Sequence, residues 1–238
     1  MIPSLAPCFT GIFLWYKDGL ALPGENACSI PGKDLLDKHV VEDLLCRFAR
    51  THPDSDRRAL ISMWTQWHFG ALIIPVTAAS LLIDRDLPVG LEHVSIALHE
   101  DGRTAAIVLP HDGGTRCPSA TKRFSRLFEG HIEPLIEQLS SHFRVSRRLF
   151  WTNAATIFDW TLQQAEALNA SPTSLSEGRS LLSCKTDVYG RSNPMFGALQ
   201  YIEEGEQTIR RRKVCCLRYL LPGMSACGSL CPLPGNKN

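Results

Sequence analysis

The chain has 238 residues, of which 44% are hydrophobic and 21% are charged, a composition typical of a globular protein with its own core. Twenty-five basic and 24 acidic residues leave a formal net charge of +1, which gives no basic excess for a nucleic-acid partner. Residues 1–16 lack the basic start and small-residue cleavage site of a secretory signal, so we expect a cytoplasmic protein.

The first half of the chain predicts one loose segment and two helices. Residues 1–33 are rich in Pro, Gly and Ser, which predicts a loosely organised segment. Residues 34–50 carry apolar side chains at helical spacing, and residues 56–83 predict a longer helix that Pro75 should kink or split. The properly apolar part of that helix, 69–83, is short for a bilayer, so we interpret it as a buried core helix.

The second half predicts a small sheet and more helices. Residues 93–110 alternate between apolar and polar side chains around an Asp-Gly pair, which predicts a β-hairpin. Helical spacing follows over 121–143, 147–168 and 172–182, and the tail from 207 reads as a strand. The expected fold is therefore α+β, with helices packed around a small antiparallel sheet. In this compact unit, residues 34–206 form the scaffold and residues 207–238 a separate cysteine segment.

Four cysteines near the carboxyl end form the strongest chemical pattern. Cys215, Cys216, Cys227 and Cys231 are spaced C-C-x10-C-x3-C. Four thiolates suit either a 2Fe-2S cluster or a zinc ion. The adjacent pair favours the cluster, because structural zinc sites usually separate their paired cysteines by two to four residues. Neighbours in a strand point to opposite faces, so the backbone must turn near this pair if both bind one group.

The remaining cysteines show no pattern. Nine is an odd total, which does not suit the paired framework of a disulfide-rich secreted protein. Free cysteines are often buried, so we interpret five of them as inert interior thiols in a reducing compartment. These are Cys8, Cys28, Cys46, Cys117 and Cys184.

Several segments together carry a family resemblance. Residues 210–223 read RRRKVCCLRYLLPG and run into Cys227-Gly and Cys231-Pro. This tail resembles that of the FhuF-like ferric siderophore reductases, whose pattern is C-C-x10-C-x2-C. The extra residue between the last two cysteines falls at Gly228-Ser229, which is flexible enough to absorb it. Further segments that are similar to the family's motifs lie at 60–70 (LISMWTQWHFG), 99–103 (HEDGR), 149–153 (LFWTN) and 193–194 (NP).

The resemblance implies a cytoplasmic reductase with a 2Fe-2S cluster. Such a protein reduces Fe(III) in hydroxamate-type siderophores to Fe(II) by one-electron transfer and so releases the iron. The implied partners are a ferric hydroxamate siderophore, docked on residues 34–206, and an electron donor such as a small reductase or a ferredoxin-like protein. The resemblance implies no transmembrane segment and is compatible with peripheral contact with the inner membrane. The alternative is a zinc-binding interaction or ligand-binding module without redox chemistry.

Outer-sphere electron transfer needs no catalytic acid, base or nucleophile, so no catalytic side chain is expected. Within the basic run at 210–213, alternate members should face the cluster, and we predict that Arg211 and Lys213 contact the substrate. Trp151 and Asn153 are predicted to line a ligand cleft. His68 lacks a second ligand at metal-binding spacing, so we expect a buried, hydrogen-bonded histidine.

Overall fold

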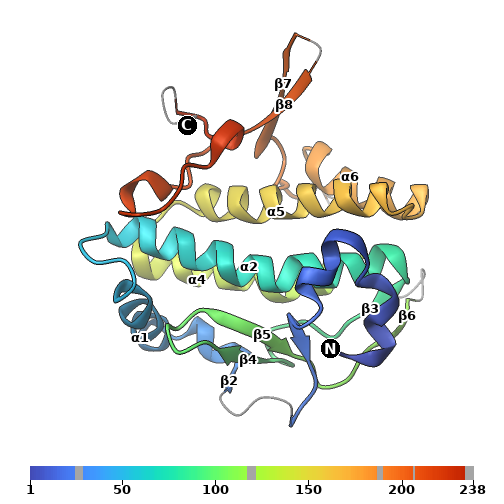
Figure 1. Ribbon diagram of the computed structural model, residues 1–238, viewed down its shortest axis with the longest axis horizontal. Coiled ribbons are helices and arrows are strands. Elements are labelled where there is room, and N and C mark those ends of the chain that lie inside the picture. Colours follow the sequence, from blue (N-terminus) through green and yellow to red (C-terminus); the bar gives the residue numbers. More distant parts are fainter. Residues whose placement is uncertain (25–28, 117–121, 187–189, 206, 234–238) are drawn as a thin grey trace.

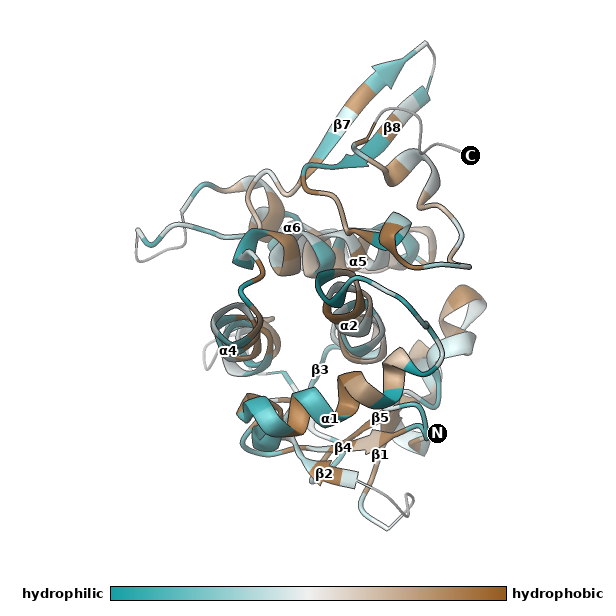
Figure 2. Ribbon diagram, turned by 90° about the vertical axis from the view of Figure 1, so that its left-hand side faces the viewer, coloured by the Kyte–Doolittle hydropathy of each residue, from teal (hydrophilic) through white to brown (hydrophobic). Residues whose placement is uncertain are grey.

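The computed structural model describes residues 1–24, 29–116, 122–186, 190–205 and 207–233. Its helices lie in the middle, with a small sheet on one side and the C-terminal segment on the other (Figure 1, Figure 2). The helices are α1 (Lys38–Ala49), α2 (Arg57–Leu82), α3 (Ser125–Leu127), α4 (Glu133–Phe143), α5 (Arg147–Ala167) and α6 (Pro172–Ser183). These elements confirm the expected mixture of helices and small sheets.

Helix α2 forms the centre of the molecule and packs most extensively against α5. The side chain of Asp56 caps its first turn by accepting hydrogen bonds from the amides of Arg58 and Ala59. The helix continues through Pro75 without a break, so the predicted split does not occur. Among the described helices, α2 is long and apolar enough for a membrane span, but 78% of that window is buried inside the protein. This burial confirms its interpretation as a core helix.

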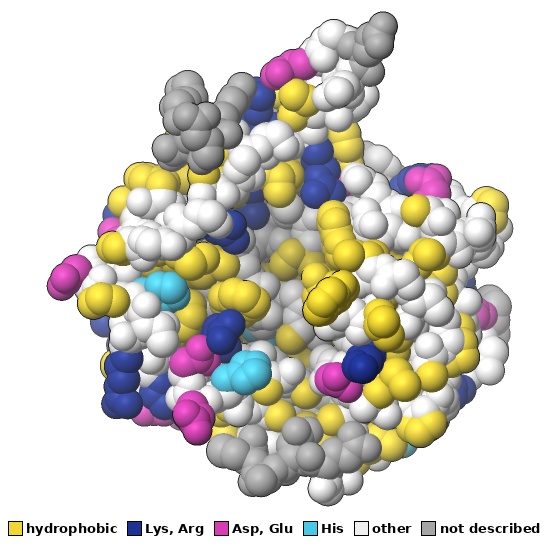
Figure 3. Space-filling view, in the orientation of Figure 1, with side chains coloured by type: hydrophobic (Ala, Val, Ile, Leu, Met, Phe, Trp, Pro, Cys, Tyr) yellow, Lys and Arg dark blue, Asp and Glu magenta, His cyan; other side chains and the backbone are white. Residues whose placement is uncertain are grey.

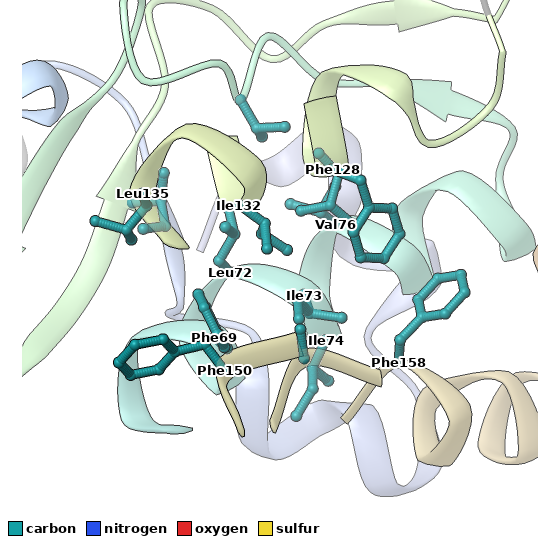
Figure 4. Packing of buried hydrophobic residues seen from close by; sticks show 14 of the residues in the cluster. Phe69, Leu72, Ile73, Ile74, Val76, Phe128, Ile132, Leu135, Phe150 and Phe158 are labelled. Atoms are coloured by element: carbon teal, nitrogen blue, oxygen red, sulfur yellow. The ribbon is translucent and has the colours of Figure 1, made fainter. Parts of the chain in front are cut away.

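The core lies between α2, α4 and α5. Phe69 and Ile73 of α2, Phe150 and Phe158 of α5, and Phe128 of a π-helical turn at Phe128–Ile132 belong to one buried cluster, in which Phe69 lies beside Phe150 (Figure 4). Phe128 and Phe158 meet edge to face with ring centroids 5.0 Å apart. The predicted helix at 121–143 is therefore present as α3, the π-helical turn and α4 in succession.

The main sheet has the strand order β1-β5-β4-β2. Its strands are β1 (Leu20–Ala21), β2 (Ser29–Pro31), β4 (Ser95–Leu98) and β5 (Thr104–Val108). Strands β4 and β5 form the predicted hairpin, in which Ile96 pairs with Ile107. Gly102 closes the turn at φ +82°, and a Cβ atom there would lie 2.5 Å from the carbonyl oxygen of Leu44. The sheet is not purely antiparallel, because β1 pairs with β5 in parallel.

The amino-terminal segment is better packed than its composition suggests. Two 3-10 helices, at Pro3–Cys8 and Gly11–Tyr16, place Leu5 and Phe13 in the main core. Strands β1 and β2 of the main sheet also belong to this segment. Proline and glycine here shape tight turns, and several apolar residues between them, such as Ile2, Phe9 and Leu20, are buried.

A second hairpin joins the scaffold to the cysteine segment. Strands β7 (Leu199–Glu204) and β8 (Gln207–Arg212) pair antiparallel, and they project from the body beyond α5 (Figure 1). A short third pair consists of β3 (Arg85–Asp86) and β6 (Gly114–Thr115). Strand β8 agrees with the predicted C-terminal strand, whereas β7 falls in residues for which we had predicted no strand.

Candidate metal centre

The adjacent cysteines lie beyond the strand and not within it. Strand β8 ends at Arg212, and the chain reverses at Leu217, which has the left-handed φ of +63°. This turn lets the amide of Leu217 donate a hydrogen bond to Sγ of Cys215 at 3.3 Å. The backbone turn that an adjacent pair requires is therefore present immediately after Cys216.

The second pair of cysteines flanks one short turn. Gly228–Leu230 forms a 3-10 turn, with Cys227 just before it and Cys231 just after it. The amide of Cys231 donates to the carbonyl of Gly228 at 3.0 Å, and Gly228 itself adopts φ +57°. The three residues between the cysteines thus fit into a single turn that glycine makes accessible.

All four thiols line one cavity of about 200 Å³. Its remaining walls come from Arg218, Tyr219, Met224 and Ala226, so among the described residues no carboxylate or imidazole faces it. Cys216 is only 2% exposed and Cys231 only 3%, whereas Cys215 and Cys227 are partly accessible from solvent. A set of thiols alone, half buried and half accessible, matches the donor chemistry of iron–sulfur clusters.

The electrostatics of the thiols also fit a bound cationic group. Burial, followed by the neighbouring Cys216, raises the pKa of Cys227 to about 12, and burial raises the pKa of Cys215. Metal binding reverses this situation, because a coordinating thiol loses its proton to the ion. In the described part of the chain, no three His, Cys, Asp or Glu side chains are grouped to hold a single ion. The four thiols line one shared cavity.

A buried polar network fixes the cysteine loop on the helices. Ser62 of α2 donates through Oγ to the carbonyl of Cys216 at 2.7 Å. Asn153 of α5 donates through Nδ2 to the carbonyl of Ser62 at 3.1 Å and to Oγ1 of Thr65 at 3.2 Å. The Oδ1 atom of Asn153 accepts a short hydrogen bond from the guanidinium of Arg212. Helices α2 and α5 therefore position the cysteine loop through the hydrogen bonds of Ser62 and Asn153.

The residues predicted to contact substrate lie in two different environments. Arg211 is partly exposed and pairs with Glu204 at 3.1 Å, and Lys213 is exposed. Trp151 is buried, and Asn153 is 0% exposed, with its amide engaged in the network just described. Both side chains therefore belong to the interior of the described structure, so neither offers a solvent-facing surface to a ligand.

The sequence reasoning missed Arg212, Arg218 and Ser62. Strand periodicity indicates that residues 210 and 212 share one face and residues 211 and 213 the other, but it does not say which face is buried. The structure buries Arg212 to 3% exposure and places Arg218 in the wall of the cavity. The signal for Ser62 was its place in the LISMW segment, where its hydroxyl interrupts an apolar helix face.

The cysteines outside the C-terminal segment differ in burial. Cys8 is buried, as predicted, and its thiol donates to the carbonyl of Leu5 at 3.1 Å. Cys46 and Cys184 are exposed, so the prediction of interior thiols was wrong for both. Cys28 and Cys117 lie outside the described residues.

The buried histidine predicted at position 68 is confirmed. His68 is completely buried, and its Nε2 lies 3.0 Å from Nε2 of His131. Its Nδ1 lies 2.8 Å from Oγ1 of Thr104, so both ring nitrogens have partners. The indole of Trp64 stacks parallel to its ring with centroids 5.5 Å apart. Within the described chain, these side chains form a structural connection and not a metal site.

One buried carboxylate holds the β7–β8 hairpin onto α5. Asp159 accepts from the hydroxyl of Tyr201 at 2.5 Å and from the guanidinium of Arg210 at 2.7 Å. Gln163 donates to the same carboxylate at 2.9 Å. Burial and the bond to Asp159 raise the pKa of Tyr201 above its ordinary value.

We expect D159N to loosen this hairpin without unfolding the core. The variant leaves the half-buried guanidinium of Arg210 without its anion, which costs about 2–3 kcal/mol in this part of the protein. Hydrogen exchange should quicken at the amides of β7 and β8 and stay unchanged at those of α2. Y201F removes only the hydroxyl and should give a smaller effect in the same strands. Equal exchange in D159N and the parent would contradict this anchoring role.

The fold and the site define an α+β protein that presents a cavity of four cysteine thiols on a helical scaffold. Residues 62–209 match the family described as ferric iron reductase FhuF-like transporter, and residues 212–233 match the FhuF 2Fe-2S C-terminal domain. The chain therefore belongs to the FhuF-like family, and its C-terminal segment is a 2Fe-2S domain. The latter match decides between the cluster and the zinc ion that ligand type alone left open.

A curated relative agrees with this assignment. The chain is 28% identical over 175 residues to a ferric siderophore reductase of Escherichia coli (strain K12). The aligned part makes up 73% of this chain and 65% of the relative, so the chain matches slightly less than two thirds of that protein.

Proposed function

We propose that the protein is a cytoplasmic ferric-siderophore reductase. It passes one electron from a 2Fe-2S cluster on Cys215, Cys216, Cys227 and Cys231 to Fe(III) in a hydroxamate siderophore. The observation that carries this proposal is the partly open cavity lined by the four thiols, in a segment that matches a 2Fe-2S domain. The activity named for the Escherichia coli relative supports the same conclusion.

Coordination chemistry explains why a single electron is sufficient. Hydroxamate oxygens are hard ligands that suit Fe(III), and they hold the softer Fe(II) less tightly. The chelate gains one electron, the cluster loses one, and no proton transfer by a side chain is required. The chain has to keep the thiols close to the surface, and partly exposed Cys215 and Cys227 provide that access.

The surroundings of the cavity favour docking of a bulky chelate at its rim. Tyr219 is more than half exposed, and Met224 and Arg218 lie beside it in the cavity wall. Basic side chains gather where the β7–β8 hairpin meets the helical body (Figure 3). Arg211 is partly exposed and Lys213 is exposed, and we propose that both attract an anionic electron donor or an anionic chelate.

The amino-terminal 3-10 helix at Gly11–Tyr16 offers a surface for peripheral contact with the inner membrane. Trp15 is 85% exposed, and Leu14 beside it is 54% exposed. Exposed tryptophan and leucine side chains insert into the interface of a lipid bilayer. Binding to liposomes of phosphatidylethanolamine and phosphatidylglycerol that W15S abolishes would support this contact.

Rapid mixing of the reduced protein with a chelate tests the proposed reaction. We expect a protein reduced by dithionite, and freed of excess reductant without air, to be reoxidised by a ferric trihydroxamate. One Fe(II) should be trapped by a ferrous-specific chelator for each cluster oxidised. Ferric citrate and a ferric catecholate, offered at equal concentration, measure the preference for hydroxamate. Reoxidation no faster than in chelate-free buffer would refute the reductase assignment.

A further inference from the structure

Arg212 differs from the other cations of its strand. Arg210 pairs with Asp159 and Arg211 pairs with Glu204, so each of these charges is balanced by a carboxylate. Arg212 is buried to 3% exposure, and within the described residues it forms no ion pair with an acid. Its hydrogen bonds go to neutral oxygens, Oδ1 of Asn153 and the carbonyl of Val214. A guanidinium remains charged in such an environment, so the interior holds an uncompensated positive charge.

Arg212 lies beside the cysteine loop. Its guanidinium donates to the carbonyl of Val214, the residue before Cys215, and to Asn153, which in turn binds Ser62, the residue that holds the carbonyl of Cys216. Burial lowers the pKa of Arg212, the neighbouring sulfur groups of Cys216, Cys227 and Cys215 act in the opposite direction, and the nearby Arg218 lowers it further. Asn153 cannot release the guanidinium easily, because its own amide is bound to α2 at Ser62 and Thr65. A fixed, desolvated cation beside sulfur ligands acts in a low-dielectric region, where its field is screened only weakly.

We propose that Arg212, oriented by Asn153, is a positioning residue that raises the reduction potential of the cluster held by the four cysteines. Reduction adds one negative charge to the cluster, and a nearby fixed cation stabilises the reduced form more than the oxidised form. The inference rests on the electron-carrying role proposed above. By setting the reduction potential, Arg212 controls how readily the cluster takes up and passes on an electron.

Redox titration of the purified holoprotein tests this assignment without any siderophore. The oxidised and reduced fractions are followed by visible absorption against mediators, anaerobically, for the parent, R212Q and R212K. In R212Q we expect a ratio of reduced to oxidised cluster at least tenfold lower at any given potential, a shift of about 59 mV for one electron. R212K keeps the charge but loses the paired guanidinium hydrogen bonds to Asn153 and Val214, so its shift in potential should be smaller than that of R212Q.

Two further variants keep the inference testable. R211Q removes the same charge from the adjacent residue, whose side chain is paired with Glu204, and should shift the potential less than R212Q. N153D nearly preserves the shape of the network but adds a negative charge beside Arg212, so the ratio should fall as in R212Q. N153D is the decisive measurement if R212Q does not retain its cluster.

The inference is overturned if R212Q or N153D carries a full cluster at the parent potential, or if R211Q shifts it as much as R212Q. Because no chelate is present, this outcome is independent of the reductase assay. A shifted potential in a protein that no ferric hydroxamate reoxidises would leave the inference standing and remove the proposed function.

Discussion

A C216S variant purified without oxygen is expected to lose most of its cluster. Cys216 is buried, and its backbone carbonyl accepts a hydrogen bond from the hydroxyl of Ser62, so the structure holds this side chain position firmly. A serine hydroxyl is a harder and less acidic donor than a thiol, and it binds cluster iron weakly. Iron and acid-labile sulfide should fall by at least tenfold per protein, and the visible charge-transfer bands should disappear with them.

The exposed cysteine at position 46 provides the matched control. Cys46 lies on α1, and C46S should keep the parent spectrum and iron content. C231S tests the ligand next to the unusual three-residue spacing and should behave like C216S. A normal spectrum with full iron in C231S would exclude that residue as a ligand. Colourless parent protein with one zinc ion per chain would remove the cluster altogether.

The elements that sequence predicted well are those in which one local pattern decides the structure. The hairpin around Gly102 needed only strand alternation and a turn residue, and α2 needed only a long apolar stretch with a cap at Asp56. Of the two outcomes predicted for Pro75, a split was wrong, because α2 stays continuous there and is buried along most of its length. Strand β7 was missed because Asp159, distant in sequence, holds its hairpin on α5.

In the site, too, features set by local sequence were predicted and features set by distant contacts were not. The four cysteines were found from their spacing, because ligand spacing is encoded locally. The role of Asn153 could not be predicted in this way, because its partners Ser62 and Arg212 lie 91 and 59 residues away in the chain. A polar residue in an apolar motif indicates a hydrogen bond but not its partner. Only the tertiary structure distinguishes a side chain that meets the substrate from one that supports the cysteine loop.

Helix α2 links the two ends of the molecule through one short segment. Ser62 holds the carbonyl of Cys216, and Trp64, two residues on, donates from its indole nitrogen to the carbonyl of Gly102 at 2.9 Å. His68 continues the series toward His131. The LISMWTQWH motif therefore supports the cysteine loop on one side and the β4–β5 turn on the other. The buried members of the motif therefore serve to position the site.

The second large effect is expected in acid and comes from the buried histidine pair. Nδ1 of His131 donates to the carbonyl of Val89 at 2.7 Å, so its Nε2 must accept the proton of His68 Nε2. Nδ1 of His68 then accepts from the hydroxyl of Thr104. Both rings are neutral in this arrangement, and a further proton on Nε2 of His131 would set two N–H donors against each other at 3.0 Å. Burial lowers the pKa of His131 to about 4 and also lowers that of His68.

Because the folded pKa lies below the ordinary value of about 6.5, the unfolded chain takes up protons first as the pH falls. Stability is complete above pH 6.5 and is lost progressively between pH 6.5 and about 4. For His131 alone the free energy of unfolding should fall by about 2 kcal/mol between pH 7.5 and pH 5, and His68 adds to the loss. Urea titrations at the two pH values measure it. H131Q should show a smaller loss, whereas H39Q, which alters an exposed histidine, should match the parent. Identical pH dependence in the parent and H131Q would show that this pair does not limit stability in acid.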